Sequence, residues 1–276
     1  MSQDRIRWFD ELGMDDVATV GGKNASLGEL RRALAPAGVR VPNGFATTAA
    51  AYREFLGAAG LDALIERETA GLDTTDLPRL QQAGRAIRAA VRAAELPAPL
   101  ADALREAYRT LEAEHGVGCD VAVRSSATAE DLPDASFAGQ QETFLNVVGA
   151  DVLLAAVRRC YASLFTDRAI VYRAQHGYGH GDVALSAGVQ KMVRSDLGCA
   201  GVMFSLDPES GFRDAVVISG AWGLGESVVQ GSVNPDEFTV FAPTLLRGFR
   251  PILQRRVGSK EMKLVYAEGG TGRTRA

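Results

Sequence analysis

The chain has 276 residues, of which 46% are hydrophobic, and it carries 30 Lys and Arg against 34 Asp and Glu, a formal net charge of −4. This apolar content is enough for a substantial core, so we expect a globular body of one large or two smaller lobes. The slightly acidic balance, without a basic block, argues against a nucleic acid as the partner. The charged first sixteen residues lack an apolar signal segment and no apolar run could span a bilayer, so we expect a cytoplasmic protein without a membrane partner.

A glycine turn precedes the first predicted helix. The run Val20–Lys23 leads into leucines spaced three and four residues apart, from Leu27 to Leu34, as on the apolar stripe of a helix. Lys23 thereby stands at a helix N-terminus, where unpaired N–H groups and the helix dipole attract an anion. The motif is not a Walker P-loop, because its first glycine is missing and Asn24 stands where Ser or Thr is needed. The alternative is an ordinary turn that ends in a lysine.

Further helices are predicted up to residue 182. Thr48 can cap a helix, and apolar residues spaced from Leu80 to Val91 and from Leu100 to Leu111 indicate two amphipathic helices separated by prolines. Asp151 can cap one long helix that runs past Val171. We expect the charges on these helices to be solvated surface.

The most informative segment is Val121–Val147. Arg124 follows a short apolar run, so we expect its guanidinium at a strand edge, where its planar set of donors can bind phosphate oxygens. Gly139 allows close approach of the backbone in the loop that follows, and residues Thr143–Val147 alternate as a strand does. The segment therefore predicts a hairpin that holds a polyphosphate; the alternative is a polar surface hairpin.

From Val183 the pattern changes to strands joined by short turns. The predicted strands are Ala184–Val193, Cys199–Ser205, Ala215–Ser219 and Glu237–Phe241. The short spacings indicate antiparallel hairpins rather than βαβ crossovers. We therefore predict an α+β architecture with two lobes, residues 1–182 and residues 183–276, and a cleft between them.

The end of the first of these strands could contact a purine. Backbone groups near Gln190 can meet an adenine edge, and Met192 and Val193 offer apolar contact to the ring. The alternative is a plain core strand with a solvated Lys191.

The glycine-rich run Trp222–Gly231 is similar to the glycine-rich turn of dinucleotide-binding domains, but the third glycine position of that motif holds Val228. Glu226 and Glu237 could instead face ribose hydroxyls or a phosphate that carries Mg²⁺, or they could be surface carboxylates.

The cysteines and histidines form neither a disulfide nor a metal pattern. Cys119, Cys160 and Cys199 are far apart and lack CxxC spacing, so we expect buried thiols. His176 and His180 are four residues apart, but the glycine-rich segment between them argues against a helix that presents both to a metal.

Several long blocks of the sequence, taken in order, resemble a known family. They are Val20–Leu30, Val41–Leu56, the segment around Arg124, Val189–Gly211 and Trp222–Phe238. Over most of its length the chain closely resembles the N-terminal nucleotide-binding domain of the phosphoenolpyruvate synthase (pyruvate, water dikinase) family. The resemblance implies an ATP-grasp-like fold in which two lobes clasp ATP, with related domains in pyruvate phosphate dikinase and rifampicin phosphotransferase.

The resemblance also implies site residues in both lobes. Lys23 and Arg124 become catalytic, phosphate-binding cations, which agrees with the dependence of phosphoryl transfer on alignment and charge neutralisation. The other residues that it assigns to the ATP site are Gly139 and Thr143 in the loop over the phosphates, Gln190, Met192 and Val193 at the adenine, and Glu226 and Lys260.

In this family the β-phosphoryl of ATP passes to a histidine on a separate swivelling domain and then to pyruvate in a further domain, with ATP and Mg²⁺ as cofactors. None of the three histidines lies in the Thr-Cys-His setting of that carrier. The family places an acidic metal ligand, a Gln and an Arg in a stretch beyond Ala276, so we expect nucleotide binding without the complete reaction. Two alternatives are the ATP domain of a rifampicin-phosphotransferase-like enzyme and a non-catalytic nucleotide-binding subunit.

Overall fold

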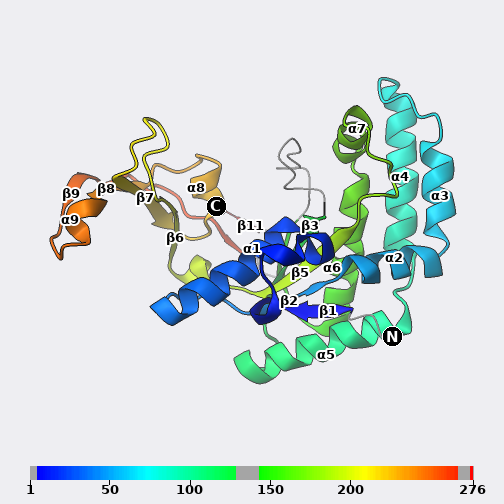
Figure 1. The fold of residues 1–276 in the computed structure, drawn as a ribbon, viewed down its shortest axis with the longest axis horizontal. Coiled ribbons are helices and arrows are strands. Elements are labelled where there is room, and N and C mark those ends of the chain that lie inside the picture. The colour runs from blue at the N-terminus through cyan, green and yellow to red at the C-terminus, as the bar shows by residue number, and fades with distance from the viewer. Residues whose placement is uncertain (1–4, 129–142, 267–273, 276) are drawn as a thin grey trace. The chain divides into compact units, whose positions relative to one another are not determined.

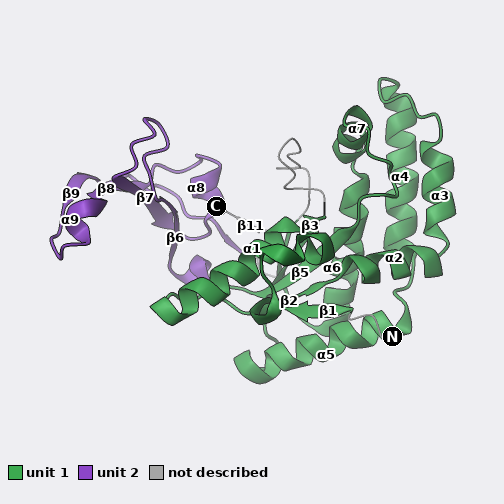
Figure 2. Ribbon diagram, in the orientation of Figure 1, with its two compact units in different colours: residues 1–192 green, residues 193–276 purple. Residues whose placement is uncertain are grey.

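The computed structural model describes residues 5–128, 143–266 and 274–275. The chain divides into two compact units, Met1–Met192 and Val193–Ala276 (Figure 2). Helices and antiparallel sheets make up the described parts of the chain, which confirms the predicted α+β class. The first unit extends ten residues past the predicted boundary at 182, because strand β5, Leu185–Lys191, pairs with strands of that unit.

The first unit contains a five-stranded antiparallel sheet in the order β1-β2-β5-β3-β4. Its other strands are β1 Ile6–Trp8, β2 Gly44–Thr47, β3 Val121–Ala127 and β4 Thr143–Val147. The strands predicted at both ends of the Arg124 hairpin are thereby confirmed. Because β3 continues to Ala127 and pairs on both sides, Arg124 lies inside a strand and not at its end, which corrects that expectation.

Helices surround this sheet (Figure 1). Their bounds are α1 Val17–Leu34, α2 Ala49–Ala58, α3 Leu61–Thr69, α4 Leu77–Ala93, α5 Ala98–His115, α6 Ala150–Ala162 and α7 Asp167–Gln175. Single 3₁₀ turns occupy Phe9–Glu11 (η1), Met14–Asp16 (η2), Ala35–Ala37 (η3) and Ser163–Phe165 (η4). The two amphipathic helices predicted around residues 80–111 are confirmed as α4 and α5.

Capping by threonine sets two of the helix starts. The Thr48 side chain accepts a hydrogen bond of 3.2 Å from the N–H of Ala51, which confirms the predicted cap of α2. The single long helix predicted from Asp151 is wrong. It breaks at the 3₁₀ turn η4, and the Thr166 hydroxyl then caps α7 by accepting from the Ala169 N–H at 3.3 Å.

The sheet of the first unit separates two apolar clusters. One face carries residues of the large core, among them Phe45, Val123 and Val189, which are in register with one another. The next residue along β2, Ala46, belongs instead to the smaller cluster, which contains Val20 and Ala25 of α1. Gly188 and Arg124 are in register with Ala46, so they lie on the face that α1 covers.

The second unit contains an antiparallel meander in the order β6-β7-β8-β9. Its elements are η5 Ser195–Leu197, β6 Cys199–Phe204, β7 Ala215–Trp222, α8 Glu226–Val229, β8 Asp236–Phe241, α9 Ala242–Leu245, β9 Ile252–Arg256, β10 Val265–Tyr266 and β11 Thr274–Arg275. The meander confirms the hairpins predicted among residues 199–241, whereas the first predicted strand, Ala184–Val193, corresponds to β5 and pairs with β2 and β3 of the first unit instead of with β6. Within the described part of the whole chain, no helix is long and apolar enough to cross a membrane.

A buried cation joins α7 to the loop that follows it. Arg173 is fully buried, and its Nη1 donates to the Leu164 carbonyl at 2.6 Å. Its Nε donates to Nδ1 of His180 at 3.2 Å, which requires a neutral imidazole with the proton on the other nitrogen. Burial and then the nearby Arg173 charge lower the pKa of His180 to about 4.

This contact predicts a loss of stability in acid. The His180 pKa of about 4 is below the ordinary value of 6.5, so the neutral form favours the folded state. The contribution is complete above pH 6.5 and is lost as the pH falls towards 4, with a slope of at most about 1.4 kcal/mol per pH unit. Urea unfolding at pH 7, 6 and 5 measures this slope. The decrease in stability per pH unit should be smaller in His180→Asn and unchanged in the control His115→Asn. An unchanged slope in His180→Asn would contradict the role of neutral, buried His180 in this pH dependence.

Candidate functional site

The glycine turn before Lys23 interrupts α1. The helix starts at Val17, earlier than predicted, but Gly21 has φ 74° and ψ 161°, a conformation that essentially only glycine adopts. A Cβ at Gly21 would also lie 2.6 Å from the carbonyl oxygen of Ser126 in β3. The turn is therefore pressed against β3, and Lys23 follows at the start of the second helical segment.

Asn24, the residue after Lys23, is held by the sheet below it. It is 1% exposed, and its Nδ2 donates to the Val20 carbonyl at 3.1 Å and to Ser186 Oγ at 2.8 Å. Its backbone N–H donates to Ser126 Oγ at 3.3 Å. These bonds attach the turn to β3 and β5 together.

The same contacts bring the turn close to Arg124. A Cβ at Gly188 would lie 3.0 Å from Cγ of Asn24, so the Asn24 carboxamide rests directly on the Gly188 backbone. Gly188 is the register partner of Arg124 in β3, and Thr143 of β4 is the partner of Arg124 on the other side. The structure thus brings the Lys23 turn, Arg124 and Thr143 to neighbouring positions on one face of the sheet, although 101 residues separate the two cations (124 minus 23).

Arg124 lies on the face of the sheet that α1 covers. Its side chain is half-buried, and neither an ion pair nor a side-chain hydrogen bond joins it to another residue among those that the structure describes. A planar guanidinium in this state can donate two parallel hydrogen bonds to phosphate oxygens. Gly139 and the rest of its loop lie outside the described residues, so the predicted phosphate loop is placed only where it rejoins the sheet at the exposed Thr143.

The predicted adenine segment is the end of β5. Gln190 Nε2 donates to the Pro42 carbonyl at 3.1 Å. Lys191 is not the solvated lysine of the alternative interpretation, because its Nζ forms an ion pair with the Asp120 carboxylate. The Met192 N–H donates to the Asp120 carbonyl at 3.0 Å, whereas Val193 begins the second unit and is 64% exposed.

The two remaining candidates lie in the second unit. Glu226 is the first residue of α8, and its Oε1 accepts from Nε2 of Gln230 at 2.8 Å. Lys260 donates to the Gly258 carbonyl at 2.9 Å and to the Asp236 carboxylate, and the latter hydrogen bond lowers the pKa of Asp236. Sequence reasoning did not single out Asp236.

Glu237, the other carboxylate considered for this site, lies 3.3 Å from Arg256 on the neighbouring strand. This position fits the surface alternative for Glu237.

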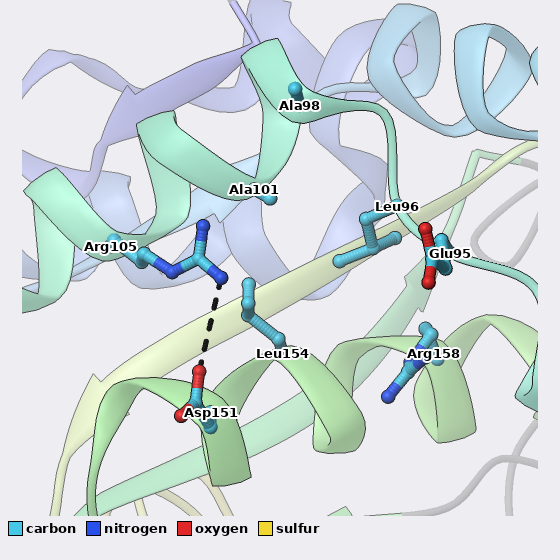
Figure 3. A pocket seen from close by; sticks show the side chains of 8 residues that line it. All are labelled: Glu95, Leu96, Ala98, Ala101, Arg105, Asp151, Leu154 and Arg158. Atoms are coloured by element: carbon cyan, nitrogen blue, oxygen red, sulfur yellow. Dashed lines mark ion pairs between the residues drawn. The ribbon is translucent and has the colours of Figure 1, made fainter.

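A cavity of about 490 Å³ lies elsewhere in the first unit, between α5 and α6 (Figure 3). Arg105 and Asp151 stand at one end with Nη2 and Oδ1 3.8 Å apart, and Glu95 and Arg158 line the other end. No candidate residue from the sequence lines this cavity. Of the candidates in the first unit, the Lys23 turn, Arg124 and Thr143 lie instead on the face of the sheet that α1 covers.

Metal-binding clusters are not found in the described part of the chain: no three or more His, Cys, Asp and Glu side chains gather there. Cys119 and Cys160 are buried thiols, as expected, but Cys199 is exposed because it lies at the outer start of edge strand β6.

Comparison with known families identifies the class of domain. The model of the pyruvate phosphate dikinase AMP/ATP-binding domain matches residues 17–276. The chain belongs to this family. The matched range includes both the glycine turn before Lys23 and Arg124.

Named relatives of this family member are phosphoenolpyruvate synthases, which confirms the resemblance seen in the sequence. The chain is 58% identical to that of Pseudomonas aeruginosa over 94% of its length and 33% of the relative, and 55% identical to that of Escherichia coli over 95% and 33%. It is 47% identical to a probable phosphoenolpyruvate synthase of Methanocaldococcus jannaschii over 96% of its length and 22% of the relative. The chain thus spans about a third or less of the length of these relatives.

Gly21, inside α1, and Gly38, which follows the 3₁₀ turn η3, predict different costs of substitution. Gly21→Ala should destabilise the fold by about 2–4 kcal/mol, because it combines a forbidden backbone conformation with overlap against Ser126. Gly38 also has positive φ, 82°, but nothing lies within 4 Å of a Cβ there. The matched Gly38→Ala should therefore cost only about 1 kcal/mol, the conformational part alone. Equal losses in the two variants, measured by urea unfolding, would show that the turn is not pressed against β3.

Proposed function

We propose that this chain is the ATP-binding part of a phosphoenolpyruvate synthase and that Lys23 and Arg124 hold the phosphate groups of ATP. The observation that carries the proposal is the position of the Lys23 turn, fixed through Asn24 onto Gly188, the direct register partner of Arg124. The AMP/ATP-binding family and the identity of about half of all residues to phosphoenolpyruvate synthases support it.

The charges fit a polyphosphate better than a neutral ligand. A lysine ammonium acts as a compact point charge, while an arginine binds two oxygens of one phosphate through its planar donors. The start of a helix adds the partial positive charge of its N–H groups at Lys23. Together these groups neutralise charge and align the phosphoryl group, which is most of what catalysis of phosphoryl transfer requires.

The rest of the ATP site follows from the family resemblance. We propose an ATP-grasp-like arrangement in which Gly139 and Thr143 cover the phosphates, Gln190, Met192 and Val193 contact the adenine, and Glu226 and Lys260 contribute from the second unit. Mg²⁺, when bound, would supply further neutralisation of the phosphate charge, since it commonly uses one or two carboxylates plus phosphate oxygens.

In the whole enzyme, we propose that a histidine on a separate domain attacks the β-phosphorus of ATP bound here and displaces AMP, and that water then cleaves off the γ-phosphoryl group as inorganic phosphate. A pyruvate-binding domain would then accept the phosphoryl group and form phosphoenolpyruvate, in the cytoplasm. The greater length of the relatives leaves room for both domains. The identity of these relatives as phosphoenolpyruvate synthases favours the synthase over a rifampicin phosphotransferase or a non-catalytic nucleotide-binding subunit.

Removal of either cation tests the phosphate site. Lys23→Ala and Arg124→Ala should each weaken ATP binding by about 1.5–3 kcal/mol, the range of charge-assisted hydrogen bonds. Calorimetry with ATP and Mg²⁺ measures the affinity. Arg109→Ala serves as the control, because this exposed arginine pairs only with Glu106 of its own helix among the described residues and should leave the affinity unchanged. Parent-like affinity in both Lys23→Ala and Arg124→Ala would remove these residues from the site.

A further inference from the structure

A chain of buried hydrogen bonds runs from the large core of the first unit to the glycine turn. Tyr161 of α6 donates its hydroxyl to Thr47 Oγ1 at 2.9 Å, and the Thr47 carbonyl accepts from Ser186 Oγ at 2.5 Å. Ser186 Oγ in turn accepts from Nδ2 of Asn24 at 2.8 Å. All four side chains are at most 1% exposed, so the chain is shielded from water along its whole length.

We propose that Asn24 is a positioning residue for the nucleotide phosphates: it sets the place of Lys23 relative to Arg124 without touching the ligand. This inference rests on the proposed function, because it assumes that Lys23 binds phosphate. Asn24 is the residue that joins the buried chain to the turn, through its bonds to Ser186 and to the Val20 carbonyl.

Two close backbone approaches restrict the turn in addition to these bonds. Gly21 lies directly on Ser126 of β3, and the Asn24 carboxamide lies directly on Gly188 of β5. Since Arg124 pairs with Gly188, a shift of the turn across the sheet changes the distance from Lys23 to Arg124. The contacts of α1 with both β3 and β5 agree with this placement over the centre of the sheet (Figure 1).

The burial of Asn24 excludes direct contact with a nucleotide. In a Walker P-loop the residue after the lysine is Ser or Thr, and its hydroxyl binds Mg²⁺. Here the corresponding carboxamide is 1% exposed, and its Nδ2 donates hydrogen bonds to the Val20 carbonyl and to Ser186 Oγ. Asn24 can therefore affect nucleotide binding only through the position of the residues around it. Misplacement of a group by about 1 Å can lower the rate of a catalysed reaction on the order of a hundredfold.

A double-mutant cycle in this chain separates positioning from a general loss of stability. The variants are Asn24→Ala, Lys23→Ala and the double variant, with ATP and Mg²⁺ as the probe in calorimetry and circular dichroism to verify folding. Asn24→Ala should weaken ATP binding about tenfold in the parent chain and less than twofold when Lys23 is already alanine. A buried control far from the turn, Val91→Ala in α4, should destabilise the fold but change ATP affinity less than twofold.

Ser186→Ala provides a second, milder probe if Asn24→Ala does not fold. It removes the bond from Asn24 Nδ2 but leaves the bonds of Asn24 to the Val20 carbonyl and to Ser126. A loss of ATP affinity of about threefold is expected, again only while Lys23 is present.

Parent-like ATP affinity in every folded variant of Asn24 and Ser186, or an equal loss with and without Lys23, would overturn the positioning role alone. Parent-like affinity in both Lys23→Ala and Arg124→Ala would overturn the phosphate site and this inference together.

Discussion

The first unit depends on the close packing of a glycine turn against the middle of its sheet. The absence of a side chain lets Gly21 lie directly against Ser126 and lets the Asn24 carboxamide lie directly on Gly188. Asn24 adds hydrogen bonds to the Val20 carbonyl and to Ser186. An unpaired carboxamide in this place would be costly because it is removed from water. The interaction therefore specifies one position for α1 on the sheet, and the two predicted phosphate cations are placed by it.

Local signals in the sequence predicted much of the fold. The amphipathic spacing of α4 and α5, the threonine cap of α2 and the hairpins of the second unit all depend on residues that are near one another in the chain. The prediction of one long helix from Asp151 was wrong because apolar residues continue through η4. The helical spacing of these apolar residues hides the break at η4, after which the Thr166 cap starts α7. The glycine turn at Lys23 and the strand at Arg124 were visible in local patterns, but their proximity was predicted only through the family resemblance.

That proximity comes from pairings between distant segments. Asn24 and Ser186 are 162 residues apart, and no local pattern marks Ser186 or Gly188 as the surface on which α1 rests. The register of β3 on β5 decides which residues face α1, and a shift of one residue would turn Arg124 to the other side. The family resemblance indicated Lys23 and Arg124, whereas Asn24, the residue that fixes their spacing, required the three-dimensional structure.

The central place of β5 has a consequence for how the molecule is made. The ribosome synthesises β2, which ends at Thr47, well over a hundred residues before its partner β5, Leu185–Lys191. The nascent chain must therefore carry an unfinished sheet edge for well over a hundred residues. Such long-range closure slows folding and leaves strand edges exposed to aggregation until β5 has been synthesised.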